Sequence, residues 1–389
     1  MRFPEFTEEW KAEQLDNIAT LSKGIGISKE QLSEDGEPCI LYGELYTKYK
    51  SEIIKQVESK TDINGSKLKR SKANDVIIPC SGETAVDIAT ARCVPFDNIL
   101  FGGDLNVISL HQYDGAFMSY QLNGKRKYDI ARVAQGVSIV HLYGEHLKAI
   151  KTYNPTLPEQ QKIAKLLSLL DDRIDTQNKI IEKLQSLIKG LVDELMTVLL
   201  KGKLYPFSSF YIKAGEGGTP TTSVVEYYTE GTIPFIKIED LSCKYLTNNK
   251  DFITELGMQK SSAWLIPSKS VIYSNGATIG AISINEYPVC TKQGILGIVP
   301  NTNINVEYLY LLMSSSYFSK EISRIITEGT MKTAYLKDIN HIKCPLPSMA
   351  QQKNITNLTS SIEEKLSIEQ ELLRFLNLQK QYLLHMIFI

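Results

Sequence analysis

Apolar residues follow a regular pattern through the middle of the chain. After Pro158 the steps between them alternate four and three, at Ile163, Leu167, Leu170, Ile174, Ile181, Leu184, Ile188, Leu191, Leu195 and Val198, with Gln177 in the one missing place. This spacing is that of the a and d positions of a coiled coil, held for about five heptads. Pro158 suits a first helical turn, and Lys201-Gly202-Lys203 would end the helix. The pattern predicts a helix roughly 60 Å long.

The same phase returns 192 residues later, at Ile355, Thr359, Ile362, Leu366, Glu369, Leu373, Leu376, Lys380, Leu383 and Ile387. Polar residues interrupt this second stripe, so a neighbouring stripe could share the burial: Leu358, Leu372, Phe375, Tyr382 and Met386. Each helix alone would be marginal in water. We therefore expect the two helices to pair antiparallel, with a globular module at each end. Gln177 and Glu369 then either lie near a pseudo-twofold axis and fix the register, or are solvated gaps.

The chain repeats itself outside the stripes as well. The segment TYNPTLPEQQKIAKLL (152–167) matches KCPLPSMAQQKNITNL (343–358), and the same shift aligns Tyr143 with Tyr335. Upstream the shift drifts by a few residues, and VIIPCSGET (76–84) matches SVIYSNGAT (270–278). Two copies of a module and its helix suggest a ligand with two half-sites, although the duplication could be purely structural.

The repeat divides the chain into four parts. Globular modules span 1–156 and 204–346, and long helices span 157–203 and 347–389. Short apolar runs broken by Gly and Pro, such as DVIIPCSG (75–82) and GILGIVP (294–300), predict mixed α/β modules with more strand than helix. The fold class is therefore α+β, with two mixed α/β domains separated by an antiparallel coiled coil.

Composition limits the class of protein. Hydrophobic residues make up 43% and charged residues 22% of the 389 residues, which is typical of a soluble globular protein. No apolar run is long enough to span a bilayer, and MRFPEFTEEW lacks the features of a signal peptide. The six cysteines form no C-x-x-C pair, so we expect reduced thiols in the cytoplasm and no metal site.

Basic and polar residues gather where loops are expected, although the formal net charge is only −1. In the first module they are Lys67, Lys69, Arg70, Lys72, Lys125, Arg126 and Lys127; in the second they are Gly217, Gly218, Thr219, Lys237, Asn275, Lys292, Gln293 and Lys332. Lys, Arg, Asn and Gln are the residues that contact phosphates and base edges, and glycines allow close approach of a backbone. Any one of these residues could be an ordinary surface group; the DNA interpretation depends on the set.

A catalytic centre is not evident. There is no G-x-x-x-x-G-K phosphate loop, Gly24-Ile25-Gly26 lacks the third glycine of a dinucleotide fingerprint, and no H-E-x-x-H occurs. Asn154-Pro155 is not followed by the residues expected of an amino-methyltransferase, which stacks its flipped base on an aromatic ring. The pattern favours a binding subunit that acts through partner proteins.

Taken together, these residues resemble the specificity subunits of Type I restriction-modification enzymes (the HsdS family). The resemblance is carried by PTLPEQQKI (155–163), PSMAQQKNI (347–355), IIPCSGET (77–84), GGTP (217–220), IPFIKIEDL (233–241) and SNGATIG (274–280). It covers nearly the whole chain and includes the duplicated architecture. The second helix start departs from the pattern, with Gln351 in place of the usual Glu.

The resemblance implies a function and a set of partners. Two target recognition domains, at 1–156 and 204–346, would each read one half of a bipartite site in double-stranded DNA. The helices would form a spacer and dock two modification subunits, which bind S-adenosylmethionine and methylate adenine, while restriction subunits use ATP and magnesium. No cofactor would belong to this chain. By position, the DNA-reading loops would include Gly217, Gly218, Thr219, Lys237, Asn275, Gly276, Lys292, Tyr42, Ser81, Gly82 and the basic run 67–72.

Two other functions stay open at this point. The chain could be a scaffold that joins proteins through its coiled coil without contacting DNA, or a stand-alone enzyme with an unrecognised site. Changing Lys69, Arg70 and Lys72 to Glu would abolish DNA binding by a specificity subunit and would change nothing in a scaffold.

Overall fold

A computed structural model of the chain describes residues 2–63, 67–136, 139–276, 278–326 and 332–388. The chain forms two compact units. The first comprises Met1–Lys179 together with Gln370–Ile389, and the second comprises Ile180–Glu369. Each unit therefore contains one globular module and a part of each long helix, α7 (Leu157–Leu199) and α12 (Met349–Ile387).

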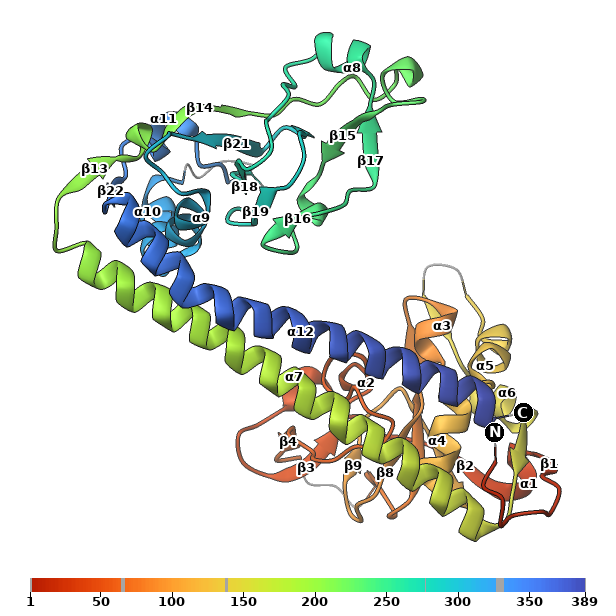
Figure 1. Ribbon diagram of the computed structural model, residues 1–389. Coiled ribbons are helices and arrows are strands. Elements are labelled where there is room, and N and C mark those ends of the chain that lie inside the picture. The colour runs from red at the N-terminus through yellow and green to blue at the C-terminus, as the bar shows by residue number, and fades with distance from the viewer. Residues whose placement is uncertain (1, 64–66, 137–138, 277, 327–331, 389) are drawn as a thin grey trace. The chain divides into compact units, whose positions relative to one another are not determined.

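The first module is built on a large antiparallel sheet and a small sheet (Figure 1). The large sheet has the order β2 (Ala19–Lys23), β10 (Leu105–Leu110), β6 (Asp75–Pro79) and β8 (Arg92–Val94). The small sheet has the order β4 (Lys60–Thr61), β3 (Glu37–Ile40), β9 (Leu100–Phe101) and β5 (Lys69–Arg70), with β3 and β9 parallel. Two-stranded pairs join β1 (Lys11–Gln14) to β12 (Lys151–Asn154) and β7 (Ser81–Gly82) to β11 (Val140–His141). The helices are α1 (Leu15–Ile18), α2 (Glu44–Thr47), α3 (Ala85–Ile88), α4 (Gly115–Asn123), α5 (Lys127–Val133) and α6 (Gly144–Lys148), with the short η1 (Lys29–Gln31).

The second module has the same plan (Figure 1). Its large sheet runs β14 (Tyr211–Glu216), β21 (Ile295–Pro300), β18 (Val271–Ser274), β19 (Ile282–Asn285) and β16 (Tyr245–Leu246). Its small sheet runs β17 (Asp251–Ile253), β15 (Ile233–Ile236) and β20 (Cys290–Thr291), with β15 and β20 parallel, and β13 (Leu204–Pro206) pairs with β22 (Lys343–Pro345). The helices are α8 (Glu255–Gln259), α9 (Val306–Ser314), α10 (Ser316–Ile325) and α11 (Leu336–Ile339), with η2 (Phe207–Ser209), η3 (Val225–Tyr227) and η4 (Ile238–Asp240).

Each large sheet is covered on both faces, which explains the continuous apolar runs in its inner strands. In β6, Val76 and Ile78 belong to a core that includes residues of α4 and α5, while Ile77 belongs to a core shared with the small sheet. In β18, Val271 and Tyr273 pack toward α9 and α10, and Ile272 packs toward the small sheet. The duplication seen in the sequence is therefore a duplication of a three-layer module.

The two long helices pack together in both units, side by side in Figure 1. In the first unit, Ile163 and Leu167 near the start of α7 share a core with Ile387 near the end of α12, so the helices are antiparallel there. Phe117 of α4 and Phe388 close the same core, with ring centroids 5.4 Å apart. In the second unit, Val192 and Met196 of α7 share the main core with Ile355 of α12.

The two alternating stripes face inward. Every predicted stripe position on both helices is buried or half-buried except Val198, which is exposed. Gln177 is buried, whereas Glu369 is only half-buried. The neighbouring stripe does not share the burial as expected: Leu358, Phe375, Tyr382 and Met386 are exposed, and only Leu372 is half-buried. The polar members of the second stripe are instead accommodated by polar partners.

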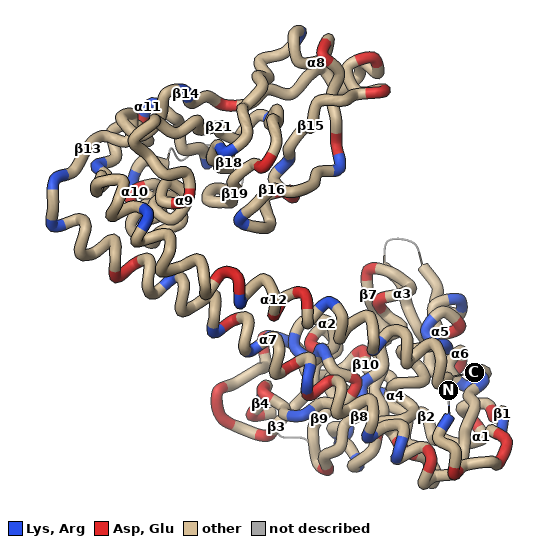
Figure 2. The backbone as a smooth tube through the Cα atoms, in the orientation of Figure 1, with Lys and Arg blue, Asp and Glu red and all other residues tan. Residues whose placement is uncertain are grey.

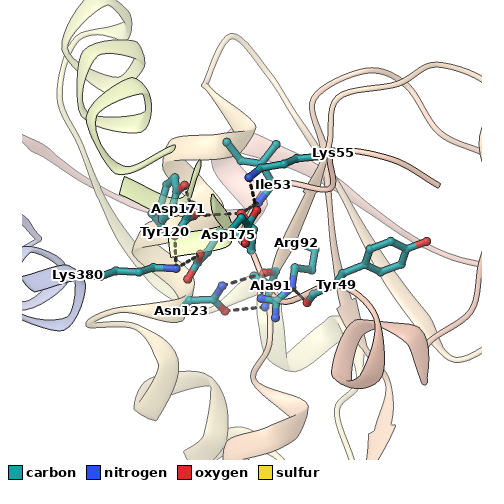
Figure 3. A network of polar contacts seen from close by, with 12 residues as sticks. Tyr49, Ile53, Lys55, Ala91, Arg92, Tyr120, Asn123, Asp171, Asp175 and Lys380 are labelled. Carbon is teal, nitrogen blue, oxygen red and sulfur yellow. Dashed lines mark hydrogen bonds and ion pairs between the residues drawn. The ribbon is translucent and has the colours of Figure 1, made fainter. Parts of the chain in front are cut away.

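Lys380 is one of these polar members, and it lies in a buried ion cluster in the first unit (Figure 3). Its ammonium group is 2.5 Å from Glu52 and 2.7 Å from Asp171 of α7. The Tyr120 phenol donates to Asp171 over 2.7 Å. Burial acts to lower the pKa of Lys380, but the charges of Glu52 and Asp171 outweigh it and hold that pKa above its ordinary value. The cluster ties the end of α12 to α7 and to the first module.

The second unit has an ion cluster at the equivalent place, but there the module contributes a lysine instead of a carboxylate. Lys244 of the module contacts the carboxylates of Glu307, at 3.0 Å, and of Glu363 on α12. Glu363 is the repeat equivalent of Asp171, and Lys244 is the equivalent of Glu52, at the shift of 192. In the second unit, Lys244 of the module therefore pairs directly with Glu363 of α12. In the first unit, Glu52 of the module and Asp171 of α7 are both acidic, and Lys380 of α12 bridges them.

Candidate nucleic-acid interface

The candidate residues of the second module gather at one edge of its large sheet. At this edge β14 and β18 end and β21 begins, because neighbouring strands are antiparallel. The loops that leave it contain Gly217, Gly218 and Thr219; Asn275 and Gly276; and Lys292 and Gln293. Backbone hydrogen bonds join them, from Gly217 N–H to Ile295 and from Asn275 N–H to Gly294. The sequence scatters these residues over 77 positions, and the sheet brings them together.

Two glycines are required here by close packing. A Cβ atom at Gly217 would lie 2.1 Å from the Thr291 carbonyl oxygen, and one at Gly218 would lie 2.4 Å from the Ala263 backbone nitrogen. No other residue fits at such distances, so the loop can press against β20 and the segment after α8 only as Gly-Gly. The loop then places Thr219 at the surface, where its hydroxyl accepts from Gln293 N–H.

A pocket of about 340 Å³ lies between this loop and the small sheet, and its lining includes Thr219, Tyr228, Lys237, Asp251 and Lys292. Lys237 is 2.8 Å from Asp251, and that contact raises the pKa of Lys237. Lys292 is exposed, and within the part of the chain that the structure describes no carboxylate pairs with it. The pocket therefore offers one neutralised lysine and one available lysine.

Asn275 is not at the surface. It is 1% exposed, and its side-chain amide donates to the Ala334 carbonyl oxygen over 3.1 Å while the Ala334 N–H donates to the Asn275 carbonyl oxygen. It thereby fixes the segment that follows exposed Lys332 to the end of β18. This geometry suits a residue that positions a loop better than one that reads a base. Ala277 of the same SNGATIG motif lies outside the described residues.

The first module places two of its candidates at the equivalent edge. Ser81 and Gly82 form β7 directly after β6, and the Tyr46 phenol donates to the Ser81 carbonyl oxygen. Tyr42, one turn before Tyr46 on the chain, is exposed. The Ser81 hydroxyl lies 3.2 Å from Nδ1 of His141.

The basic residues of the first module do not join this group. Lys67, Lys69, Arg70 and Lys72 precede β6, whereas Ser81 and Gly82 follow it, so the two sets lie at opposite ends of the same strand. Arg70 is held by Glu37 through two hydrogen bonds of 2.5 and 2.9 Å, which neutralise it. Lys125 and Arg126 lie between α4 and α5, and Lys127 is the first residue of α5. Arg126 pairs with Asp129, and burial together with the charge of Arg92 lowers the pKa of Lys127.

Four further residues of these edges carry DNA-compatible chemistry and were not selected from the sequence. Tyr228 lines the pocket of the second module, and His141 contacts Ser81 in the first. Tyr143 and Tyr335 are both exposed, each at the start of a short helix. The sequence did carry a signal for the last two, because the repeat aligns them with each other.

Metal sites, cysteines and membrane-spanning helices are the remaining features that bear on the class of protein. Among the described ranges, no group of three or more His, Cys, Asp or Glu side chains could hold a metal ion. All six cysteines are free, and five of them are buried. Burial raises the pKa of the Cys344 thiol to about 12. None of the helices within the described residues is long and apolar enough to cross a membrane.

Comparison with known proteins agrees with this architecture. The family model of the Type I restriction modification DNA specificity domain matches twice, over residues 7–186 and 210–377. The EcoR124I/EcoR124II specificity subunit of Escherichia coli is 30% identical over 179 residues, which are 43% of this chain and 43% of that protein. The MjaIX specificity subunit of Methanocaldococcus jannaschii is 30% identical over 154 residues, which are 38% of this chain but only 35% of that protein. The chain thus matches less than half the length of these two relatives.

Other similarities extend over the full length. The MjaVIII specificity subunit of Methanocaldococcus jannaschii is 24% identical over 399 aligned positions, covering 94% of this chain and 88% of that protein. The fold resembles the crystal structure of a Type I restriction-modification system S subunit from M. genitalium, with a TM-score of 0.59, 18% identity and coverage of 100% of this chain and 97% of that chain. With two copies of the matching domain and the fold described above, the chain belongs to the Type I restriction-modification DNA specificity family.

Proposed function

We propose that this chain is the DNA specificity subunit of a Type I restriction-modification enzyme, in which each module reads one half of a bipartite DNA site. The observation that carries the proposal is the presence of two copies of the family's DNA specificity domain, each with glycine-containing loops gathered at one edge of its large sheet. In the second module this edge also carries Lys292, Lys332 and the pocket beside Thr219.

The low net charge is compatible with DNA binding, because a duplex contacts only one face of a protein. Figure 2 shows Lys and Arg interspersed with Asp and Glu along both units. Several basic residues are neutralised by carboxylates, among them Arg70, Lys237 and Lys244. The free chain therefore offers few phosphate contacts, and we expect tight binding only in a complex with partner subunits.

The proposed partners are two modification subunits and the restriction subunits of the same system. The long helices leave large apolar side chains exposed, including Leu169 on α7 and Phe375 and Tyr382 on α12, which would suit a protein partner. S-adenosylmethionine, ATP and magnesium would be bound by those partners, and the chain would contribute no catalytic group. The complex would act in the cytoplasm, where the host's DNA lies.

The test is a binding selection with the assembled complex. The chain, reconstituted with the modification subunits of its host, is incubated with a random-sequence DNA pool and the bound DNA is sequenced. We expect two short specified words separated by a gap of fixed length. A bound pool without such a pattern would overturn the proposal and favour a protein scaffold. Methylation or cleavage of DNA by the purified chain alone would favour a stand-alone enzyme.

Charge-reversal variants make the test local. Lys292→Glu and Lys332→Glu should each weaken binding of the complex to its selected site at least tenfold, because each places a negative charge at the sheet edge that we propose contacts the DNA phosphates. Lys320→Glu, at an exposed position on α10, is the matched control and should bind as the original chain does. A triple change of Lys69, Arg70 and Lys72 to Glu tests whether the opposite end of β6 also contacts DNA.

A further inference from the structure

Two tyrosines occupy equivalent exposed positions in the two modules. Tyr143 directly precedes α6 and Tyr335 directly precedes α11, 192 residues later. Their exposed fractions are nearly the same, 45% and 47%. Neither side chain caps the helix that follows it. These are large side chains held at the surface without a role in the local backbone.

Each ring has a lysine over it, and the two lysines come from different places in the repeat. The ammonium group of Lys23, at the end of β2, is 5.7 Å from the centroid of the Tyr143 ring. The ammonium group of Lys337, inside α11, is 5.5 Å from the centroid of the Tyr335 ring. Lys23 and Lys337 are not equivalent positions of the repeat. The two modules therefore place a cation on the equivalent tyrosine from different elements.

The polar ends of these pairs are not used within the chain. Other tyrosines donate their phenol internally: Tyr113 to Glu13, Tyr120 to Asp171 and Tyr308 to the Pro345 carbonyl oxygen. Across the residues that the structure describes, neither Tyr143 nor Tyr335 has such a bond, and neither Lys23 nor Lys337 forms an ion pair. A hydroxyl donor and an ammonium group therefore stand together at the surface of each module.

Both pairs lie beside the glycine loops of the proposed interface. The residue before Tyr143, Leu142, donates its N–H to the Cys80 carbonyl oxygen, directly before Ser81 and Gly82. In the second module, Ala334 makes the same backbone bond to Asn275, directly before Gly276. The same hydrogen bond thus sets each tyrosine next to the loop that follows the central strand.

We propose that Tyr143 with Lys23, and Tyr335 with Lys337, are matched clamps for DNA phosphates, one in each module. The lysine supplies the charge and the phenol donates a hydrogen bond to a phosphate oxygen, as Lys and Tyr do in contacts that position a protein on DNA without reading its sequence. Two equivalent clamps would place both modules in the same register on the DNA phosphate backbone. The loops at the sheet edges, which differ between the modules, would then alone distinguish one half-site from the other. This inference rests on the proposed function and assigns residues to it.

The experiment compares single variants in the complex with modification subunits. Tyr143→Phe and Tyr335→Phe remove only the hydroxyl group, and Lys23→Gln and Lys337→Gln remove only the charge. Affinity is measured for the selected site and for an unrelated duplex, over a series of salt concentrations. Tyr128→Phe, at an exposed tyrosine of α5, and Lys320→Gln are the controls.

We expect each lysine variant to weaken binding to both duplexes by a similar factor, about threefold to tenfold, and to lower the slope of log affinity against log salt by about one. Each Phe variant should weaken both by about twofold to tenfold without changing that slope. Thermal unfolding should match the original chain, because neither hydroxyl is bonded in the fold.

Three results would overturn the clamps. Unchanged affinity and salt slope would show that the pairs do not contact DNA. A loss restricted to the selected site would indicate contact with a base, and reduced co-purification of modification subunits would indicate a protein contact. If the original complex selects no bipartite site, the proposed function fails; if it does and the variants bind equally well, only the clamps fail.

Discussion

Gln160 and Gln352, which lie 192 positions apart, make the same hydrogen bonds in the two units. The side-chain oxygen of Gln160 accepts from the backbone N–H of Asp114 over 2.9 Å, and that of Gln352 accepts from the N–H of Asn305 over 2.7 Å. Asp114 and Asn305 are the residues that cap α4 and α9. In each unit, one buried amide therefore fixes the start of a long helix to the start of a core helix.

Replacing either glutamine with leucine should destabilise its unit by about 2–3 kcal/mol. The amide nitrogen also donates to a proline carbonyl, Pro155 in one unit and Pro347 in the other, so either change leaves at least two backbone groups without their partners. Chemical denaturation followed by circular dichroism measures the loss. Gln161→Leu, at an exposed position of α7, is the control and should change stability by less than about 0.5 kcal/mol. An equal effect of Gln161→Leu and Gln160→Leu would contradict this account.

Lys380→Met should be among the most destabilising single changes in the first unit. It leaves the carboxylates of Glu52 and Asp171 buried close together without a cation, and breaking a buried pair from one side costs about 3–5 kcal/mol. Lys365→Met removes the ion pair between exposed Lys365 and half-buried Glu369 on the same helix, and we expect a loss of about 1 kcal/mol, well below that of Lys380→Met. Adding Glu52→Gln to Lys380→Met should restore part of the lost stability; no recovery would mean that packing of the lysine stem, and not charge, is what matters.

The stability of the Lys380→Met variant should also depend on pH. Burial already raises the pKa of Glu52, and loss of the lysine removes the main influence that lowers it. The folded variant then holds a proton on Glu52 at pH values where the unfolded chain has released it. Stability must therefore rise as the pH falls, and we expect the deficit of the variant to shrink from about pH 8 to about pH 5. Unfolding curves of variant and original chain at both pH values check the sign.

Gly190→Ala should stabilise the chain. Gly190 lies inside α7, is exposed, and a Cβ atom there would meet no atom within 4 Å. Alanine restricts the unfolded chain and favours the helix, by about 0.5–1 kcal/mol. A higher midpoint of thermal unfolding would support the prediction. A gain in stability combined with weaker binding of modification subunits would show that a partner packs closely against this position.

Gly218→Ala should damage the proposed interface of the second module. The new methyl group would lie 2.2 Å from the Ser262 hydroxyl and 2.4 Å from the Ala263 backbone nitrogen, so the loop must shift or the unit must lose about 1–3 kcal/mol. We expect binding of the complex to its selected site to fall at least tenfold. Gly190→Ala, inside α7 and away from this edge, meets no atom within 4 Å and serves as the control.

Periodicity and repetition in the sequence were sufficient to predict the long helices, their contact and the duplicated module, because both signals depend only on which residues must be buried. The stripe containing Thr359, Glu369 and Lys380 was harder to interpret. A polar residue on an apolar stripe can be solvated or paired, and the partner of Lys380 is Glu52, 328 positions away. The spacing of residues around Lys380 in the sequence therefore cannot predict this partner.

The proposed DNA contacts show the same limit. Ser81 and Lys72 are close in sequence, yet β6 separates them, because a strand carries the residues before and after it to opposite edges of a sheet. Asn275 has the side-chain chemistry of a base-reading residue, but its amide is buried and donates a hydrogen bond to the Ala334 carbonyl oxygen. Conversely, Tyr143 and Tyr335 were aligned by the repeat without any role, since neither lysine partner could be inferred from sequence spacing.

The core that joins Ile163 and Leu167 to Ile387 and Phe388 has a consequence for how the protein is made. A ribosome finishes residues 1–156 long before it reaches the segment that covers Phe117. Until the last turns of α12 emerge, the nascent first module exposes an aromatic surface, and Glu52 of the module and Asp171 of α7 lack the lysine that pairs with them. A premature stop near residue 370 would consequently destabilise the first module, which is synthesised first, rather than the segment next to the stop. Chaperones should then bind such truncated chains through their N-terminal half.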